Sequence, residues 1–74
     1  MKKYPQAISD YKKAIQYSKD LPIIYYLLGL DYEAISEFKN ALINYKKYVS
    51  LTTETNEYKT YAQSRIKALK KYEN

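Results

Sequence analysis

The sequence lacks the residues on which most small catalytic and metal-binding proteins depend. None of its 74 residues is a cysteine or a histidine. Without cysteine the chain cannot form disulfides or thiolate metal sites, and without histidine it lacks the usual general base and the commonest metal ligand. The single glycine, Gly29, excludes a glycine-rich phosphate loop. One glycine and two prolines also argue against an all-β fold, which needs frequent turns.

The remaining polar residues form no recognisable active site. No serine or threonine stands in a motif in which a lysine would activate it. Asp31 and Glu33 point to different sides of a helix, and the other acidic residues are dispersed. The longest apolar run, residues 23–30, is far shorter than the roughly twenty residues that a transmembrane helix needs. We therefore expect no enzymatic activity, no cofactor, no metal and no membrane segment and, without a signal sequence, a cytoplasmic location.

Four segments of the chain show the periodicity of α-helices, with apolar residues at steps of three and four. The predicted helices cover about residues 4–18, 22–35, 37–51 and 57–73. Pro22 suits the first turn of the second helix, where its missing N–H breaks no hydrogen bond. The composition and the periodicity together predict an all-α fold with four helices.

Residues at the ends and in the middle of these helices indicate how they begin and pack. Ser36 is the predicted N-cap of the third helix, and residues 52–56 form a predicted turn that contains an N-cap for the fourth. Gly29 lies inside the second helix, where glycine is less favourable than alanine by up to about 1 kcal/mol. Close approach of another helix would explain a glycine there, so we expect a helix to pack against it.

The chain contains an internal repeat with a period of 34 residues. The first and third predicted helices align as Tyr4 with Phe38, Ala7 with Ala41, Ile8 with Leu42, Tyr11 with Tyr45, and Ile15 with Val49. The second helix carries the spaced residues Tyr25, Leu28, Gly29 and Tyr32. This period and this spacing are typical of tetratricopeptide repeats. Over its whole length the chain resembles the tetratricopeptide repeat (TPR) family.

The resemblance implies an antiparallel helix-turn-helix solenoid fragment. In this register residues 1–21 are the second helix of a partial repeat, residues 22–55 are one full repeat, and residues 56–74 are a capping helix. The sequence departs from the family pattern at three places, with Ser36 for the turn glycine, Thr53 for the closing proline, and Tyr48 for a small residue. The first two departures concern only loop geometry.

The resemblance also implies a function. In this family one side of each first helix lines a concave groove that holds partner peptides. The corresponding positions in the second helix are Ile23, Tyr26, Leu30 and Glu33. This surface would bind an apolar or amphipathic peptide or helix of a partner protein, and Glu33 would favour a nearby Lys or Arg. We expect a protein–protein interaction scaffold with no chemistry of its own. Alternatively, another helix of the same protein or of a second copy covers this face.

The sequence leaves two further questions open, the assembly of the chain and binding of nucleic acid. The first helix lacks the helix that should pair with it, so we expect either a fragment of a longer array or a homodimer formed through the N-terminal helix. Lys12, Lys13, Lys46 and Lys47 occupy equivalent outer positions and form a basic face. Such a face would contact phosphates in a nucleic-acid binder, but a solvated convex face explains the same lysines.

Tyrosine is unusually frequent, at eleven of the 74 residues. Most of the tyrosines fall on the apolar stripes of the predicted helices, so we expect them to serve in helix packing. Tyr17 lies off the main stripe of its helix and is expected at the surface.

Overall fold

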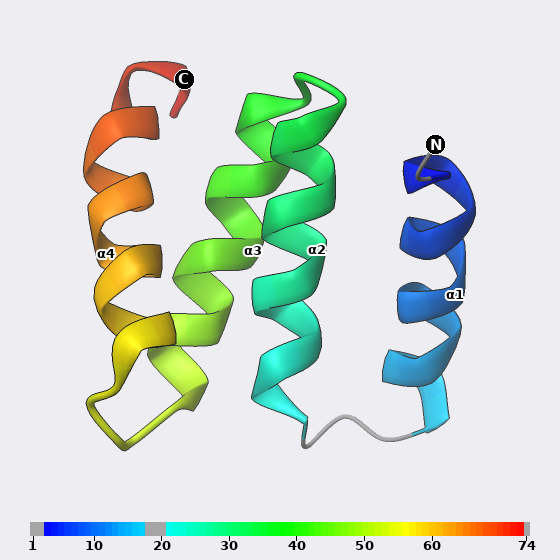
Figure 1. Ribbon diagram of the computed structural model, residues 1–74, viewed down its shortest axis with the longest axis horizontal. Helices are drawn as coiled ribbons and strands as arrows, with labels where there is room; N and C mark the ends of the chain where they lie inside the picture. The colour runs from blue at the N-terminus through cyan, green and yellow to red at the C-terminus, as the bar shows by residue number, and fades with distance from the viewer. Residues whose placement is uncertain (1–2, 18–20, 74) are drawn as a thin grey trace.

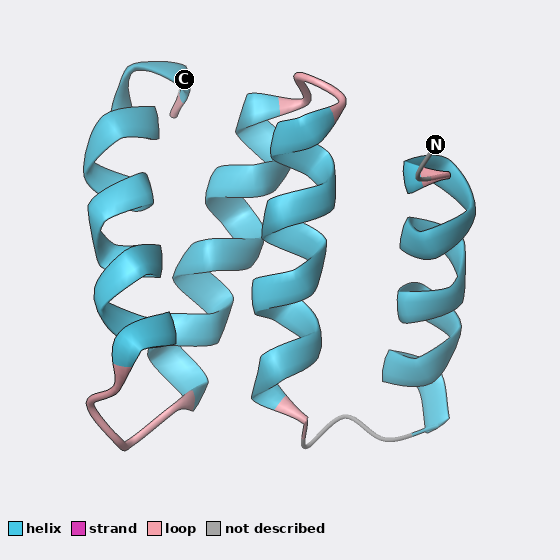
Figure 2. Cartoon of the chain, in the orientation of Figure 1, coloured by secondary structure: helices cyan, strands magenta, loops and turns pink. Residues whose placement is uncertain are grey.

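The computed structural model describes residues 3–17 and 21–73, and this part of the chain is helical with no strand (Figures 1 and 2). The elements in chain order are α1 (Tyr4–Tyr17), α2 (Pro22–Ala34), α3 (Phe38–Leu51), α4 (Glu57–Leu69) and the short 3₁₀ helix η1 (Lys70–Tyr72). The predicted all-α fold with four helices is confirmed. The last helix differs from the prediction because its final turn is 3₁₀. The predicted end of the first helix, at Ser18, lies outside the described residues.

Consecutive helices pack against one another in an antiparallel row (Figure 1). α2 makes its most extensive contacts with α3, α4 packs on the other side of α3, and α1 packs on α2. This arrangement fits the expected helical repeat, since the most extensive contacts of each helix are with its sequence neighbours. Side chains of α2 also reach α4. No helix in the described part of the chain is both long enough and apolar enough to cross a membrane.

The core is centred on α3. Its side chains Ala41 and Tyr45 have no exposed surface, and neither does Ala62 of α4. The other buried apolar residues are Ile8, Ile24, Leu28, Tyr32, Leu42, Tyr48 and Leu69. α3 is buried on two sides because it has both α2 and α4 as neighbours, whereas α1 contributes Ile8 alone to this set.

Gly29 allows the backbone of α2 to lie against the ring of Tyr45. A Cβ atom on Gly29 would stand 2.6 Å from Cε1 and 2.7 Å from Cδ1 of Tyr45. Carbon atoms in proteins do not approach this closely, so the site has no room for a side chain. The expectation that a helix packs against Gly29 is confirmed.

The turn between α2 and α3 overturns the prediction that Ser36 caps α3. Ser36 adopts the left-handed conformation, with φ of 64°, and Glu37 occupies the N-cap position without a side-chain hydrogen bond. The Ser36 N–H donates to the Glu33 carbonyl and the Glu37 N–H donates to the Tyr32 carbonyl. These two bonds form a Schellman motif that ends α2, and Ser36 occupies the position that glycine usually takes.

The start of α4 confirms the predicted cap in the preceding turn. The side chain of Asn56 accepts a hydrogen bond of 2.9 Å from the Lys59 N–H. At the other end of α4, η1 turns back to the beginning of α3. There Tyr72 stacks on Phe38 with ring centres 4.8 Å apart.

Candidate protein-interaction surface

Five tyrosines from three helices gather between α2 and α4. We call Tyr26, Tyr45, Tyr48, Tyr58 and Tyr61 the tyrosine cluster. The ring of Tyr26 lies at its centre, with centroids 6.3 Å from Tyr45, 5.4 Å from Tyr48, 5.2 Å from Tyr58 and 6.1 Å from Tyr61. Three of these contacts are edge-to-face, an arrangement that stabilises aromatic pairs by about 0.5–1.5 kcal/mol each beyond their burial.

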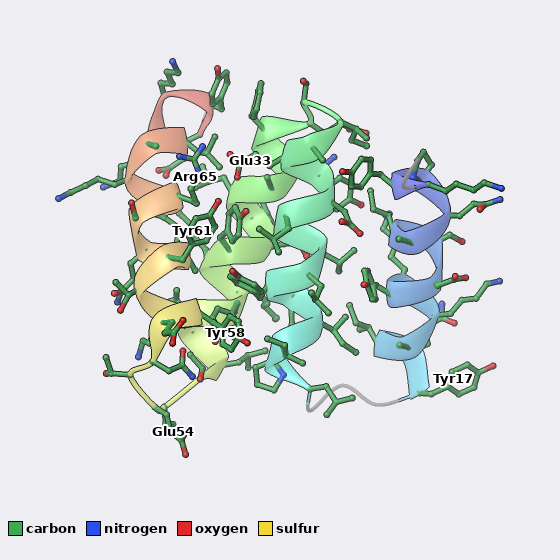
Figure 3. All side chains as sticks on the ribbon, viewed as in Figure 1. Tyr17, Glu33, Glu54, Tyr58, Tyr61 and Arg65 are labelled. Carbon is green, nitrogen blue, oxygen red and sulfur yellow. The ribbon has the colours of Figure 1, made fainter. Side chains whose placement is uncertain are left out.

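The cluster runs from the core to the surface. Tyr45 and Tyr48 are buried, whereas Tyr58 is 51% exposed and Tyr61 is 43% exposed. Figure 3 shows both exposed tyrosines projecting from the side of α4 that faces α2. Tyr26 lies between the buried and the exposed tyrosines and is itself partly buried. Its loss of hydration raises its pKa. The result is an aromatic surface held in place by buried rings of the same type.

Beside the cluster, Glu33 of α2 joins all three helices. The Tyr45 hydroxyl donates to Glu33 Oε1 at 2.9 Å, and Arg65 Nε donates to the same oxygen at 3.2 Å. Arg65 Nη2 also pairs with Glu33 Oε2, so the guanidinium engages both carboxylate oxygens. Burial, followed by the bond to Glu33, raises the pKa of Tyr45. The hydrogen bond to Glu33 likewise raises the pKa of Arg65.

The four predicted partner-binding residues have different neighbours in the structure. Tyr26 and Glu33 face α4, whereas Leu30 lines a hollow on the α1 side of α2. Ile23 is 38% exposed in the first turn of the helix. The carboxylate of Glu33 is already bonded to Arg65 and to the Tyr45 hydroxyl. The expected attraction of Glu33 for a basic residue of a partner is therefore not supported.

A hollow lies between α1 and α2. It has a volume of about 490 Å³. Its walls are formed by Tyr4, Ala7 and Tyr11 from α1 and by Leu27, Leu30 and Ala34 from α2, with Lys3 and Asp31 also lining it. The walls are thus mostly apolar, with charged residues among them.

The lysines of the predicted basic face are all exposed, but their surroundings differ. Lys12 lies 5.7 Å from the ring centre of Tyr32, and Lys47 lies 5.9 Å from that of Tyr25. Interaction with the Tyr32 side chain raises the pKa of Lys12. Lys46 instead pairs with Glu73 at 2.6 Å. Binding of nucleic acid by these lysines and Lys13 stays a prediction.

Sequence reasoning missed the contribution of α4 to this surface. The apolar stripes predict only a packing role for most tyrosines, and they predict no role for Arg65. The repeat carried a signal, because a shift of 34 residues places Tyr61 on Leu27 and Arg65 on Asp31. In the structure both residues contact α2, since Tyr61 packs on Tyr26 and Arg65 pairs with Glu33. The expectation for Tyr17 is confirmed: it is 89% exposed and points away from the other helices (Figure 3).

The polar groups of the described residues are largely bonded within the chain. Over residues 3–17 and 21–73, no group of three or more acidic side chains is positioned to hold a metal ion. No buried side-chain nitrogen or oxygen in these ranges lacks a hydrogen-bond partner. Beside the tyrosine cluster, Glu33, Tyr45 and Arg65 are bonded to one another.

Comparison with known proteins agrees with this architecture. The family model described as TPR repeat matches residues 1–36. No curated protein and no solved structure gives a significant match to the chain. The matched range includes α1, α2 and the start of the turn that follows. Over these residues, the chain is similar to the tetratricopeptide repeat family.

Proposed function

We propose that this protein is an interaction module that binds a segment of a partner protein through the face formed by α2 and α4. The observation that carries the proposal is the tyrosine cluster, in which the half-exposed rings of Tyr58 and Tyr61 pack on Tyr26. Tetratricopeptide repeats generally mediate protein–protein interactions and are typically non-catalytic scaffold modules.

Tyrosines held in this way are suited to binding. Each ring combines an apolar body with a hydroxyl group, and tyrosine is enriched among the residues that dominate interface energetics. Because Tyr58 and Tyr61 rest on another ring, less side-chain freedom is lost when a partner covers them. The partner segment would be a peptide or helix that places apolar side chains on these rings.

The Glu33–Arg65 pair shapes the selectivity of this face. Since Arg65 and Tyr45 engage the carboxylate of Glu33, that group gives little attraction to a basic residue in the partner. We therefore infer that the bound segment is apolar or amphipathic and depends on ring contacts rather than on a charge at this position.

Selection from a random peptide library displayed on phage would test the proposal. Peptides selected on the immobilised chain should bind the Tyr58→Ala and Tyr61→Ala variants at least about tenfold more weakly, which corresponds to the loss of one good aromatic contact. Tyr17→Ala is the matched control, because Tyr17 is an exposed tyrosine on α1, away from the cluster. Circular dichroism would verify that each variant keeps its helicity.

Two results would contradict the proposal. One is selected peptides that bind the wild type and both cluster variants equally. The other is a loss with Tyr17→Ala as large as that with Tyr61→Ala, which would mean that the peptides recognise exposed tyrosine in general rather than this face.

A further inference from the structure

The composition of the chain directs oxidation to its tyrosines. The sequence has eleven tyrosines, no cysteine, no tryptophan and one methionine. Cysteine and methionine are the usual targets of oxidation in proteins, whereas tryptophan and tyrosine are the side chains that most readily lose a single electron. In the tyrosine cluster the rings lie in contact with one another. The arrangement of the cluster therefore determines which rings react together when the chain is oxidised.

Tyr26 and Tyr58 are the pair in this cluster best placed to react. Their ring centroids are 5.2 Å apart, which is the shortest separation between Tyr26 and the four rings around it. Tyr58 is 51% exposed and projects from α4 on the side that faces α2 (Figure 3), so an oxidant reaches its ring and water accepts its hydroxyl proton. Tyr26 is partly buried, but its edge-to-face contact with Tyr58 lets an electron pass between the two rings.

The other three rings around Tyr26 are less able to couple with it. Tyr45 has one of its two carbons next to the hydroxyl-bearing carbon, Cε1, pressed against Gly29, where a Cβ would stand 2.6 Å away. Tyr48 is 3% exposed, so an oxidant in solution does not reach it and close packing holds its ring. Tyr61 is 43% exposed, but its centroid is 6.1 Å from that of Tyr26.

We infer that Tyr26 and Tyr58 form an intramolecular dityrosine bond when the protein meets a haem peroxidase and hydrogen peroxide. Each phenol gives up one electron and its hydroxyl proton and becomes a phenoxyl radical. The two radicals form a carbon–carbon bond between one Cε of Tyr26 and one Cε of Tyr58. The hydrogen on each of these carbons then moves to the adjacent oxygen through water, which restores both hydroxyl groups. The two electrons and two protons convert one hydrogen peroxide, at the haem of the peroxidase, into two molecules of water.

The contact between the two rings supplies the second radical. Tyr58 is oxidised first because it is the more exposed ring, takes an electron from Tyr26, and is then oxidised again. Since the rings are held together, their coupling is intramolecular and outpaces reaction between two chains at low protein concentration. Tyr17 is 89% exposed and points away from the other helices, so its radical couples with another molecule instead (Figure 3).

The bond ties α2 directly to α4. The two tyrosines are separated in sequence by the whole of α3, so the cross-link closes a long loop in the unfolded chain, as a disulfide does. Because the unfolded state loses conformational freedom, the oxidised protein resists denaturation more than the untreated protein. The inference concerns a covalent change within the chain and does not rest on the proposed function.

Treatment of dilute protein with a haem peroxidase and a limited amount of hydrogen peroxide tests the inference. The monomer, separated from covalent dimers by denaturing electrophoresis, should show the blue fluorescence of dityrosine and a mass lower by two hydrogen atoms. Digestion with trypsin should give residues 20–39 joined to residues 48–59. Fragmentation of this product in the mass spectrometer should place the bond on Tyr26 and Tyr58.

Phenylalanine variants remove the phenol and keep the ring, and circular dichroism would verify their helicity. Tyr58→Phe should lower the yield of cross-linked monomer at least about tenfold, because no other ring is as well placed. Tyr61→Phe is the matched control within the cluster and should keep most of the yield. Tyr17→Phe should leave the cross-linked monomer unchanged and reduce the covalent dimers. Treated wild type should also have a higher urea midpoint than untreated protein, whereas treated Tyr58→Phe should not.

Three results would overturn the inference. One is a monomer that keeps its original mass while covalent dimers form. Another is a cross-link within the monomer that joins a pair other than Tyr26 and Tyr58. The third is an equal loss of yield in Tyr58→Phe and Tyr61→Phe, which would mean that the separation of the rings does not select the pair that reacts.

Discussion

Gly29 of α2 and Tyr45 of α3 are fitted to each other so closely that a Cβ on Gly29 would stand 2.6 Å from the Tyr45 ring. One helical turn later on α2, Glu33 accepts the hydrogen bond from the hydroxyl of the same tyrosine. Two residues of α2 therefore position Tyr45. Gly29 leaves room for its ring, and the carboxylate of Glu33 binds its hydroxyl.

Gly29→Ala should destabilise the protein even though alanine is the better helix former. The propensity gain of up to about 1 kcal/mol is opposed by displacement of the buried Tyr45 ring, and overpacking in cores typically costs about 1–3 kcal/mol. We expect a net loss of about 1 kcal/mol in the free energy of unfolding, measured by urea denaturation. The difference between Ser64→Gly and Ser64→Ala at an exposed site in α4 calibrates the propensity. A Gly29→Ala variant more stable than the wild type would contradict this expectation.

Glu33→Ala should be more harmful than Arg65→Ala. Loss of Glu33 removes the acceptor of the buried Tyr45 hydroxyl and the partner of Arg65, and an unsatisfied buried donor costs about 1–3 kcal/mol. In Arg65→Ala, Glu33 keeps the bond from Tyr45, so we expect a loss of about 1 kcal/mol or less for this partly exposed pair. The exposed Lys46–Glu73 pair is the control, and Lys46→Ala should leave the denaturation midpoint nearly unchanged. Equal effects of all three substitutions would refute this ranking.

The protein should lose stability at alkaline pH. The folded state raises the pKa of Tyr45, chiefly through burial, so Tyr45 keeps its proton where the unfolded chain releases it. The folded state then binds more protons than the unfolded state, and the free energy of unfolding falls as pH rises. This contribution is fully present below the unfolded tyrosine pKa of about 10 and is lost above it.

Urea midpoints measured from neutral to alkaline pH would test this. Tyr45→Phe should be less stable than the wild type at neutral pH, because the bond to Glu33 is lost, but should show a shallower decline above pH of about 10. Parallel declines in the two proteins would show that other groups account for the effect.

Ser36→Gly should stabilise the turn between α2 and α3. A left-handed conformation is unfavourable for serine and acceptable for glycine, although glycine also adds freedom to the unfolded chain. We expect a net gain of about 0.5 kcal/mol or more, measured as a rise in the denaturation midpoint. Ser36→Val should have the opposite effect, because a β-branched residue fits this conformation worse. A valine variant as stable as the glycine variant would mean that the turn does not keep this conformation.

The helices could be predicted because each depends on local periodicity. The role of Gly29 also followed from sequence, since a glycine inside an apolar helix indicates close packing. Ser36 was assigned wrongly as an N-cap because serine suits both a cap and a glycine position, and only the backbone conformation distinguishes them. The departure from the family glycine at this position pointed toward the observed turn.

The candidate site was harder to predict because it depends on contacts between distant segments. Glu33 and Arg65 are 32 residues apart, and Tyr26 meets Tyr58 only because α3 brings α4 beside α2. Periodicity assigned Tyr26 and Leu30 to one exposed stripe. In the structure Tyr26 contacts α4 and Leu30 lines the hollow beside α1, so neighbouring helices cover different edges of that stripe.

The grouping of four rings around Tyr26 has an optical consequence in a protein without tryptophan. Ultraviolet excitation absorbed by one phenol can migrate to its neighbours, because their centroids lie 5.2 to 6.3 Å from that of Tyr26. Ligands that settle on Tyr58 and Tyr61 would perturb this energy transfer, which gives the molecule a built-in spectroscopic reporter that needs no attached dye.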